Sequence, residues 1–231
     1  MSGRSASTVR VLILGDSITQ GRVGDRTWRY WLWKELQRRG ADVDFVGPRT
    51  GEFDPDTEDK DDPSGYPDPA FDQDHAAQWG DSMALPAYDV RTLLTDHRPH
   101  LVINDEGYND LAVLAESPAE LARRMGAFVA EVRSVDERTD VVLGQLPHTW
   151  RTDVRLYNAL LLDLADAVDR SSSRVVVARA PDDFTAEEDT YDGTHPSASG
   201  EVKIARQFAA ALGTLPLPTA PDRSTPGESR E

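Results

Sequence analysis

The sequence predicts an α/β protein built on one doubly wound parallel sheet. Aliphatic runs of strand length alternate with amphipathic stretches of helix length along most of the chain. The run at residues 11–14 is apolar without interruption, which is typical of a strand buried on both faces of a parallel sheet. The 231 residues contain no internal repeat, which favours one compact domain.

Each expected strand is a short run rich in aliphatic residues, and five such runs lie at 11–14, 43–46, 101–105, 141–145 and 175–178. Helices are expected where apolar residues recur at helical spacing, at 28–39, 87–96, 118–134, 153–170 and 198–212. In the first helix Trp28, Trp31 and Leu32 form the apolar stripe, and Gly40 ends it. The alternation of five strands with helices predicts a doubly wound parallel sheet with sites beyond the carboxyl ends of the strands.

Three segments fall outside this alternation. Residues 1–8 are expected to be flexible, and 216–231, rich in Pro, Ser and charge, to be a disordered tail. A single domain is therefore expected at 9–215. Within it, 47–80 reads as a long acidic loop dominated by Asp, Pro and Gly, and a connection of this length is usually functional or disordered.

The acidic loop resembles a calcium loop only in part. Asp54, Asp56 and Glu58 alternate as the first ligands of an EF-hand loop do. The sixth position, however, is Asp59 instead of Gly, and the twelfth is Gly65 instead of Glu. We expect a solvated acidic lid and no metal site.

Composition limits the classes of partner. The net charge of −16 argues against nucleic acid and anionic membranes, and favours small neutral or cationic substrates. The chain has no cysteine, so disulfides and thiolate nucleophiles are excluded. No apolar run approaches the roughly 18 residues of a membrane span, and the first ten residues lack the apolar core of a signal peptide. We expect a cytoplasmic protein; its oligomeric state is not determined by the sequence.

Ser17 stands where the first strand gives way to a helix, just after Gly15. Such a serine is either an N-cap or a nucleophile placed at the carboxyl edge of the sheet. The free amides at the start of the helix would face the group that the serine attacks and could form part of an oxyanion site. Residues far downstream decide between the two readings.

A base for Ser17 is available after the last strand, at His195. Asp192 lies three residues earlier in the same turn, close enough to hold one ring nitrogen while the other faces Ser17. The alternative for His195 is a solvated loop residue before Pro196. His148, which follows the fourth strand, is the rival base, or a substrate contact without a catalytic role.

Oxyanion donors are expected at two further places. Asn109 follows the third strand and offers its side-chain amide, although it could instead cap a helix. Gly80 ends the acidic loop and offers its backbone amide, as does Ser17. For Gly80 the alternative, a turn that needs positive φ, is compatible with that role.

Taken together, Gly15-Asp16-Ser17-Ile18-Thr19, Gly80, Gly107-Tyr108-Asn109-Asp110 and Asp192-Gly193-Thr194-His195 resemble the four signature blocks of the GDSL, or SGNH, hydrolase family. The resemblance spans most of the chain, in the family's order. It implies a flavodoxin-like, three-layer α/β/α sandwich, and hydrolysis of carboxylic esters without a cofactor.

The family's roles carry over residue by residue. The resemblance implies Ser17 as nucleophile, His195 as base and Asp192 as its partner, with Ser17, Gly80 and Asn109 forming the oxyanion hole. Three further stretches look like the branch that includes carbohydrate acetyl-esterases: 28–33, 44–47 and 72–75. The expected substrate is thus an acetyl or other short acyl ester of a small molecule or sugar.

Two departures from the family pattern lie beside the expected site. The third strand ends in Asn104, Asp105 and Glu106, where the family is apolar, and buried carboxylates cost folding free energy unless paired or protonated. Either that strand is frayed, or the two acids pair with cations such as Arg22 or Arg151, or one of them faces substrate. In the second departure, Tyr108 replaces the usual Thr.

Side chains near these blocks are the candidate substrate contacts: Asp16, Trp79, Asp105, Glu106, Tyr108 and His148. Two other functions remain open. An acyltransferase would use the same triad and resolve the acyl-enzyme with an alcohol or amine. A catalytically silent binding module would share the fold, although the intact Ser17, Asp192, His195 and Asn109 argue against it.

Overall fold

The computed structural model describes residues 8–64, 66 and 68–218. The expected flexible N-terminus, apart from Thr8, and the expected tail from residue 219 onward lie outside the described residues. The expected tail start at 216 falls inside them. There Leu217 packs against the core, and the carbonyl oxygen of Pro218 accepts a hydrogen bond from the Asp42 amide over 3.0 Å.

The main sheet runs in the order β2-β1-β6-β7-β8, and every pairing in it is parallel. The five strands lie where the sequence predicts them: β1 (Val9–Gly15), β2 (Val43–Val46), β6 (Leu101–Asp105), β7 (Asp140–Gly144) and β8 (Val175–Ala178). A sixth strand, β5 (Ala76–Ala77), pairs with the end of β1. Strand order reverses at β1 and β6, where doubly wound sheets place their sites.

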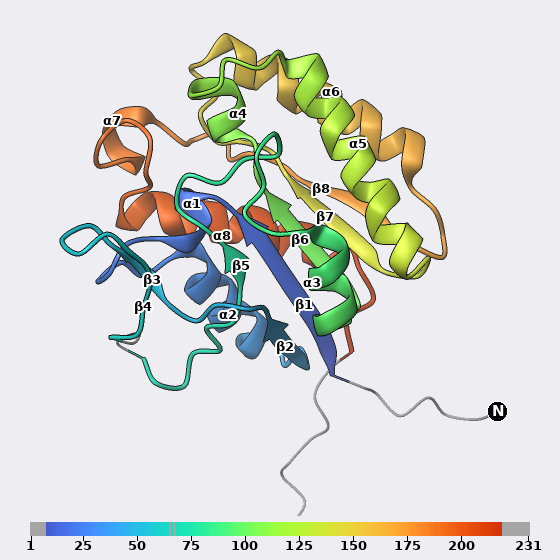
Figure 1. Ribbon diagram of the computed structural model, residues 1–231, viewed down its shortest axis with the longest axis horizontal. Helices are drawn as coiled ribbons and strands as arrows, with labels where there is room; N and C mark the ends of the chain where they lie inside the picture. Colours follow the sequence, from blue (N-terminus) through green and yellow to red (C-terminus); the bar gives the residue numbers. More distant parts are fainter. Residues whose placement is uncertain (1–7, 65, 67, 219–231) are drawn as a thin grey trace, which may run out of the picture.

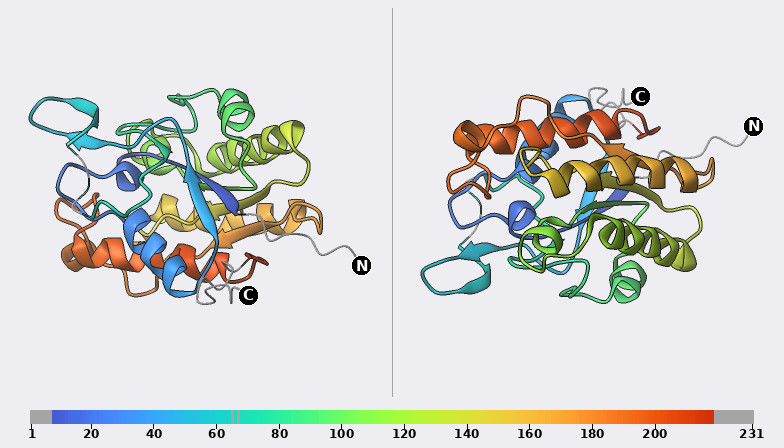
Figure 2. Two further views of the ribbon diagram at one scale, coloured as in Figure 1. Left: turned by 90° about the horizontal axis from the view of Figure 1, so that it is seen from below. Right: turned by 90° about the horizontal axis from the view of Figure 1, so that it is seen from above.

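Helices cover both faces of this sheet (Figure 1). The long helices are α2 (Trp28–Arg38), α3 (Val90–His97), α5 (Pro118–Val135), α6 (Thr152–Val168) and α8 (Ala198–Leu212). Figure 2 shows α2 beside α8 on one side of the strands, and α3 with α5 on the opposite side. The predicted three-layer α/β/α sandwich is confirmed. Expected helix bounds are met within three residues.

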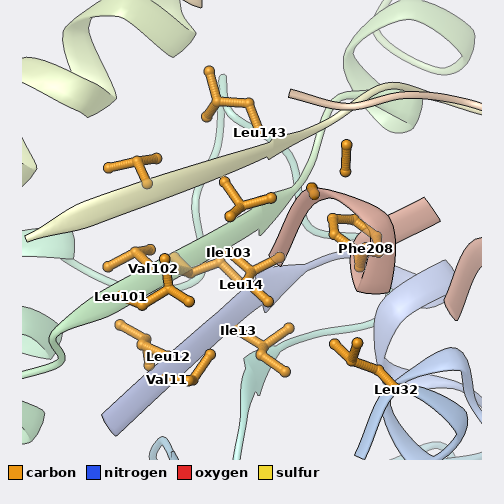
Figure 3. Packing of buried hydrophobic residues seen from close by; sticks show 14 of the residues in the cluster. Val11, Leu12, Ile13, Leu14, Leu32, Leu101, Val102, Ile103, Leu143 and Phe208 are labelled. Atoms are coloured by element: carbon orange, nitrogen blue, oxygen red, sulfur yellow. The ribbon is translucent and has the colours of Figure 1, made fainter. Parts of the chain in front are cut away.

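The core lies between these layers (Figure 3). Leu12, Ile13 and Val102 have no solvent exposure, and the buried ring of Trp28 stacks on Phe208 at 4.3 Å between ring centroids. Burying each large aliphatic side chain contributes about 1.5–3 kcal/mol to the stability of the fold. The continuous apolar runs of β1 and β6 therefore hold these two strands at the centre of the sheet. Their rigid placement matters because the residues around Ser17 and Asn109 follow directly after these two strands.

The segment 47–80 is more regular than the sequence analysis expects. It holds β5 and an antiparallel pair, β3 (Glu52–Asp54) and β4 (Asp59–Asp62). The acidic alternation there serves the turn between β3 and β4, because the Asp54 carboxylate accepts hydrogen bonds from the Asp56 amide and from Thr57 Oγ1. Asp and Thr side chains that bind nearby backbone favour such turns.

Three short helices that the periodicity did not predict follow strands or loops at the carboxyl edge: α1 (Ser17–Gln20), α4 (Tyr108–Ala112) and α7 (Ala186–Asp189). At four or five residues they are too short for a helical repeat to register in the sequence. None of the helices in residues 8–64, 66 and 68–218 combines the length and the apolar character needed to cross a membrane.

Candidate active site

Ser17 is the first residue of α1, one residue beyond the Asp16 that caps this helix. The Asp16 carboxylate accepts a hydrogen bond from the Ile18 amide over 2.9 Å. Gly15 makes the tight passage from strand to helix, because a Cβ added there would lie 2.1 Å from Thr19 Oγ1. Asp16, and not Ser17, is therefore the N-cap of α1. The interpretation of Ser17 as an N-cap does not hold.

His195 lies between Asp192 and Ser17. Its Nε2 is 3.0 Å from Ser17 Oγ, and its Nδ1 is 2.7 Å from Asp192 Oδ2. The second oxygen of Asp192 accepts the Thr194 and His195 amides at 3.0 and 2.8 Å. Because a carboxylate can only accept, Nδ1 carries the proton and Nε2 is free to accept the hydroxyl proton of Ser17.

The electrostatics of this pair favour the charged acid. Burial raises the pKa of Asp192, but the hydrogen bonds from the His195 ring and from the His195 and Thr194 amides outweigh it, so the pKa lies below its ordinary value. Asp192 is thus ionised at neutral pH. An ionised partner holds the histidine tautomer and stabilises an imidazolium.

Gly80 and Asn109 are both connected to Asp81, Gly80 as the preceding residue and Asn109 through a hydrogen bond. Gly80 has φ +82°, the region that favours glycine, and the Asn109 Nδ2 donates to the Asp81 carbonyl oxygen over 2.7 Å. One N–H of that amide remains for another acceptor, since the group has two. The amide of Ser17, at the start of α1, has no intrahelical partner.

Asp110 and Asp81 hold the segment that follows Gly80. Asp110 accepts the Met83 amide at 3.0 Å and the Ala84 amide at 2.8 Å. The Asp81 carboxylate accepts the Ala87 amide at 2.8 Å. The last residue of the Gly107–Asp110 block thereby fixes the loop that carries Gly80.

Aromatic rings stack beside the histidine. Trp79 lies 4.5 Å and Tyr191 5.6 Å from the His195 ring, centroid to centroid and nearly parallel. Phe53 of β3 stacks on Trp79 at 4.5 Å, and the Arg22 guanidinium lies 4.1 Å above Tyr191. Sequence reasoning missed three of these: Tyr191 could have been found because it adjoins Asp192, whereas Phe53 and Arg22 carry no local signal.

His148 is not placed as a base for Ser17. Its ring has no solvent exposure, and its Nε2 donates to the Thr194 carbonyl oxygen over 2.8 Å. Burial lowers its pKa to about 4, so the ring is neutral at neutral pH. Tyr108, also buried, shares a 2.8 Å hydrogen bond between its hydroxyl and Thr194 Oγ1. The alternative in which His148 is a rival base is therefore not supported, and both side chains contact Thr194.

Asp105 and Glu106 are each only 4% exposed. The strand is not frayed, since β6 continues through Asp105, and Thr19 Oγ1 donates to Asp105 Oδ2 over 3.1 Å. Pairing with Arg22 or Arg151 is wrong as well: their charges engage Asp25 at 3.5 Å and Asp153 at 2.7 Å, respectively.

Burial, reinforced by the nearby Asp16 carboxyl, raises the pKa of both Asp105 and Glu106 well above its ordinary value. Burial also raises the pKa of Asp16 to about 7, with Asp81 and Asp110 adding to the shift. All three carboxyls are buried within the protein. Of the candidate substrate contacts, Trp79 is the one that is not buried.

A metal site was not expected here. In the part of the chain that the structure describes, no group of three or more His, Cys, Asp or Glu side chains is arranged to hold a metal ion.

Comparison with known proteins gives consistent relatives. A multidomain esterase of Ruminococcus flavefaciens is 24% identical over 249 residues, covering 96% of this chain and 31% of that protein. The chain therefore spans about a third of the length of that curated relative.

Two solved structures share the fold. A carbohydrate esterase family 3 protein from Talaromyces cellulolyticus and an acetyl esterase mutant with an acetate ion each superpose with a TM-score of 0.76 at 22% identity, covering 90% of this chain and 97% of theirs.

The sequence pattern of a whole family also matches. The model of the GDSL-like lipase/acylhydrolase family aligns with residues 13–202, most of the chain, and takes in Ser17, Gly80, Asn109, Asp192 and His195. On the strength of that match, the chain belongs to the GDSL-like lipase/acylhydrolase family.

Proposed function

We propose that the chain cleaves an acetyl or other short acyl ester of a small molecule or sugar, through an acyl-enzyme formed on Ser17. The observation that carries this is the position of the His195 ring, within hydrogen-bond distance of both Ser17 Oγ and Asp192 Oδ2. A serine activated by a base that a carboxylate orients is the arrangement that acyl transfer requires.

The steps follow from those two contacts. His195 Nε2 takes the hydroxyl proton while Ser17 Oγ bonds to the ester carbonyl carbon, whose π electrons move to the oxygen. As the ester C–O bond breaks, His195 gives that proton to the leaving alcohol. A water molecule then repeats the sequence on the acyl-enzyme, releasing the acid and restoring Ser17.

The negatively charged oxygen that forms in both acylation and deacylation is stabilised by hydrogen-bond donors. We assign these to the amides of Ser17 and Gly80 and to the side chain of Asn109. In support, the hydrogen bond from Asn109 to the Asp81 carbonyl ties the two loops together. Each such donor is worth about 100- to 1000-fold in rate.

The substrate class rests on charge, surface and relatives. The net charge of −16 disfavours anionic substrates. Tyr191 beside His195, and Trp150, whose ring lies 5.2 Å from that of His148, are 40% and 41% exposed, and such rings offer flat surfaces on which sugars pack. The names of the similar structures, a carbohydrate esterase and an acetyl esterase, favour an acetylated sugar.

The test combines turnover with covalent labelling. The protein and its Ser17→Ala variant are incubated with 4-nitrophenyl esters of increasing acyl length and with acetylated sugars. Both are also treated with a serine-directed phosphonate and examined by mass spectrometry. We expect labelling at Ser17, fastest turnover on acetyl esters, and loss of both in Ser17→Ala. Ser172→Ala, an exposed serine in a turn, is the matched control and should behave as wild type.

Other outcomes discriminate the alternatives. Full turnover by Ser17→Ala would refute the acyl-enzyme. Absence of both turnover and labelling in the wild type would favour the silent binding module. With an acceptor alcohol present, more acylated acceptor than free acid would identify an acyltransferase.

A further inference from the structure

A cavity of about 380 Å³ lies between α3, α5 and the segment at residues 81–88. Its walls are mostly apolar and include Leu14, Met83, Pro86, Val90 and Phe128. Ser17, Asp192 and His195 are not among its lining residues. The volume is within the range of roughly 300–1000 Å³ that small-molecule sites occupy.

Glu106 and Asn104 lie side by side in the sheet-derived wall of this cavity, whose other charged lining residues are Asp81, Arg123, Arg124 and Glu131. The Glu106 amide donates to Asn104 Oδ1 over 2.9 Å. Glu106 Oε2 is buried and has no hydrogen-bond partner among the described residues. An unpaired buried carboxyl destabilises the fold, so its presence at the wall of a cavity calls for a partner that enters the cavity.

The charges around Glu106 favour a cation as that partner. The carboxyls of Asp16, Asp81, Asp105 and Asp110 all act on it. The two arginines that line the cavity are engaged elsewhere, Arg124 with Glu116 at 2.8 Å and Arg123 with Glu120 at 2.6 Å. A cation beside these acids would favour their ionised forms and would be stabilised by them in turn.

We propose that this cavity binds a small amine, whose ammonium group contacts Glu106 and whose apolar body packs against Leu14, Met83 and Phe128. The three donors of a primary ammonium suit Glu106 Oε2 together with the neighbouring Asn104 and Asp81 oxygens. The amine site is separate from the serine site, and its occupancy does not depend on the proposed esterase activity.

Burial raises the pKa of Glu106 well above its ordinary value, which favours the protonated acid in the free protein. An ammonium ion beside the carboxyl favours the ionised form and opposes that shift. Binding of the amine as its cation therefore releases a proton from Glu106 to the solvent. This release marks the contact with Glu106 and is absent if the ligand is held by the apolar walls alone.

The experiment measures binding of 2-phenylethylamine and of its neutral counterpart 2-phenylethanol by titration calorimetry at pH 7. The Ser17→Ala protein is used, so that the reactive serine plays no part. We expect the amine to bind at least about tenfold more tightly than the alcohol, and to release protons that are counted by comparing buffers of different ionisation enthalpy.

Variants locate the contact. Glu106→Gln should weaken binding of the amine by about tenfold and leave the affinity for the alcohol unchanged. Glu131→Gln, at another lining residue, should change neither affinity. Ala127→Phe fills the cavity from α5 and should abolish binding of both ligands, which keeps the proposal testable if Glu106→Gln does not fold.

Three results would overturn the proposal. Equal affinity for amine and alcohol would show a merely apolar pocket. If Glu131→Gln weakened amine binding and Glu106→Gln did not, the ammonium group would contact Glu131 and not Glu106. Absence of binding by either ligand up to its solubility limit would leave Glu106 with no partner from outside the protein.

Discussion

His148 donates a hydrogen bond from Nε2 to the carbonyl oxygen of Thr194 over 2.8 Å, and Thr194 immediately precedes His195. The donor is fixed because a carbonyl can only accept. Tyr108 contacts the same threonine through its hydroxyl and packs its ring against His148 at 4.3 Å. A buried neutral histidine and a tyrosine thus hold the turn that connects Asp192 to His195.

His148→Gln should lower kcat by about tenfold and change KM little. The loss of a hydrogen bond worth about 1 kcal/mol, with ring packing, lets the turn move away from Ser17. Steady-state kinetics on an acetyl ester measure this. His97→Gln, on α3, is the control and should keep wild-type kcat. A disordered His148→Gln protein by circular dichroism would mean that folding, and not the position of the turn, is at stake.

Asn109→Ala should reduce kcat/KM by about 100- to 1000-fold while phosphonate labelling of Ser17 persists at a slower rate. The reason is that the variant keeps the nucleophile and the base but loses one oxyanion donor. Stopped-flow turnover and the time course of labelling measure both effects. Wild-type turnover in Asn109→Ala would remove this side chain from the oxyanion hole.

Trp79→Ala should lower kcat/KM by up to about tenfold, because the variant removes the ring stacked on His195, and such aromatic contacts contribute about 0.5–1.5 kcal/mol. Phe53→Ala should give a smaller loss, since Phe53 contacts Trp79. Trp79→Phe retains a ring and should recover most activity. Kinetics measured in parallel with a thermal melting curve separate activity from stability. Equal kcat/KM of Trp79→Ala and wild type would contradict a role of this ring in holding His195.

Asp105→Asn should make the protein more stable at pH 8 and equally stable near pH 4. Burial raises the pKa of Asp105 above its ordinary value of 3.8, so its contribution is fully present below about pH 4 and is lost as the pH rises through the folded-state pKa. The amide keeps an acceptor for Thr19 without the charge. Urea unfolding across this pH range should show a gain of about 1–3 kcal/mol at pH 8.

Asp136 supplies the control of opposite sign. Its pKa lies below the ordinary value, chiefly through the hydrogen bond from the Arg138 amide, so it stabilises the fold above about pH 4, an effect lost as the pH falls through its folded-state pKa. Asp136→Asn should therefore be slightly less stable than wild type at pH 8. A gain in both variants would mean that net charge, and not burial, governs the response.

Much of the architecture could be predicted because its signals are local. The strand and helix positions follow from periodicities within about ten residues, and the relation of Asp192 to His195 follows from a spacing within one turn. The start of α1 was expected from the turn at Ser17, whereas the short α4, α7 and β5 were not predicted, because so few residues show no measurable period. The β3–β4 pair escaped because acidic residues dominate both strands.

The partners of the buried polar groups could not be predicted, because they come from distant parts of the chain. Thr19 and Asp105 are 86 positions apart, and His148 and Thr194 are 46 apart. Whether an acid at the end of a strand is frayed, paired or buried depends on which segments cover it, and local sequence does not determine that covering.

The sequence by itself predicted the parallel sheet and singled out Ser17, Asn109, Asp192 and His195 as candidate site residues. Both follow from hydrophobic periodicity and short motifs, which are properties of neighbouring residues. Only the tertiary structure decided that Asp16 caps α1, that His148 supports Thr194, and that Glu106 borders a cavity. Those outcomes depend on desolvation and on contacts between elements, which exist only once the sheet has assembled.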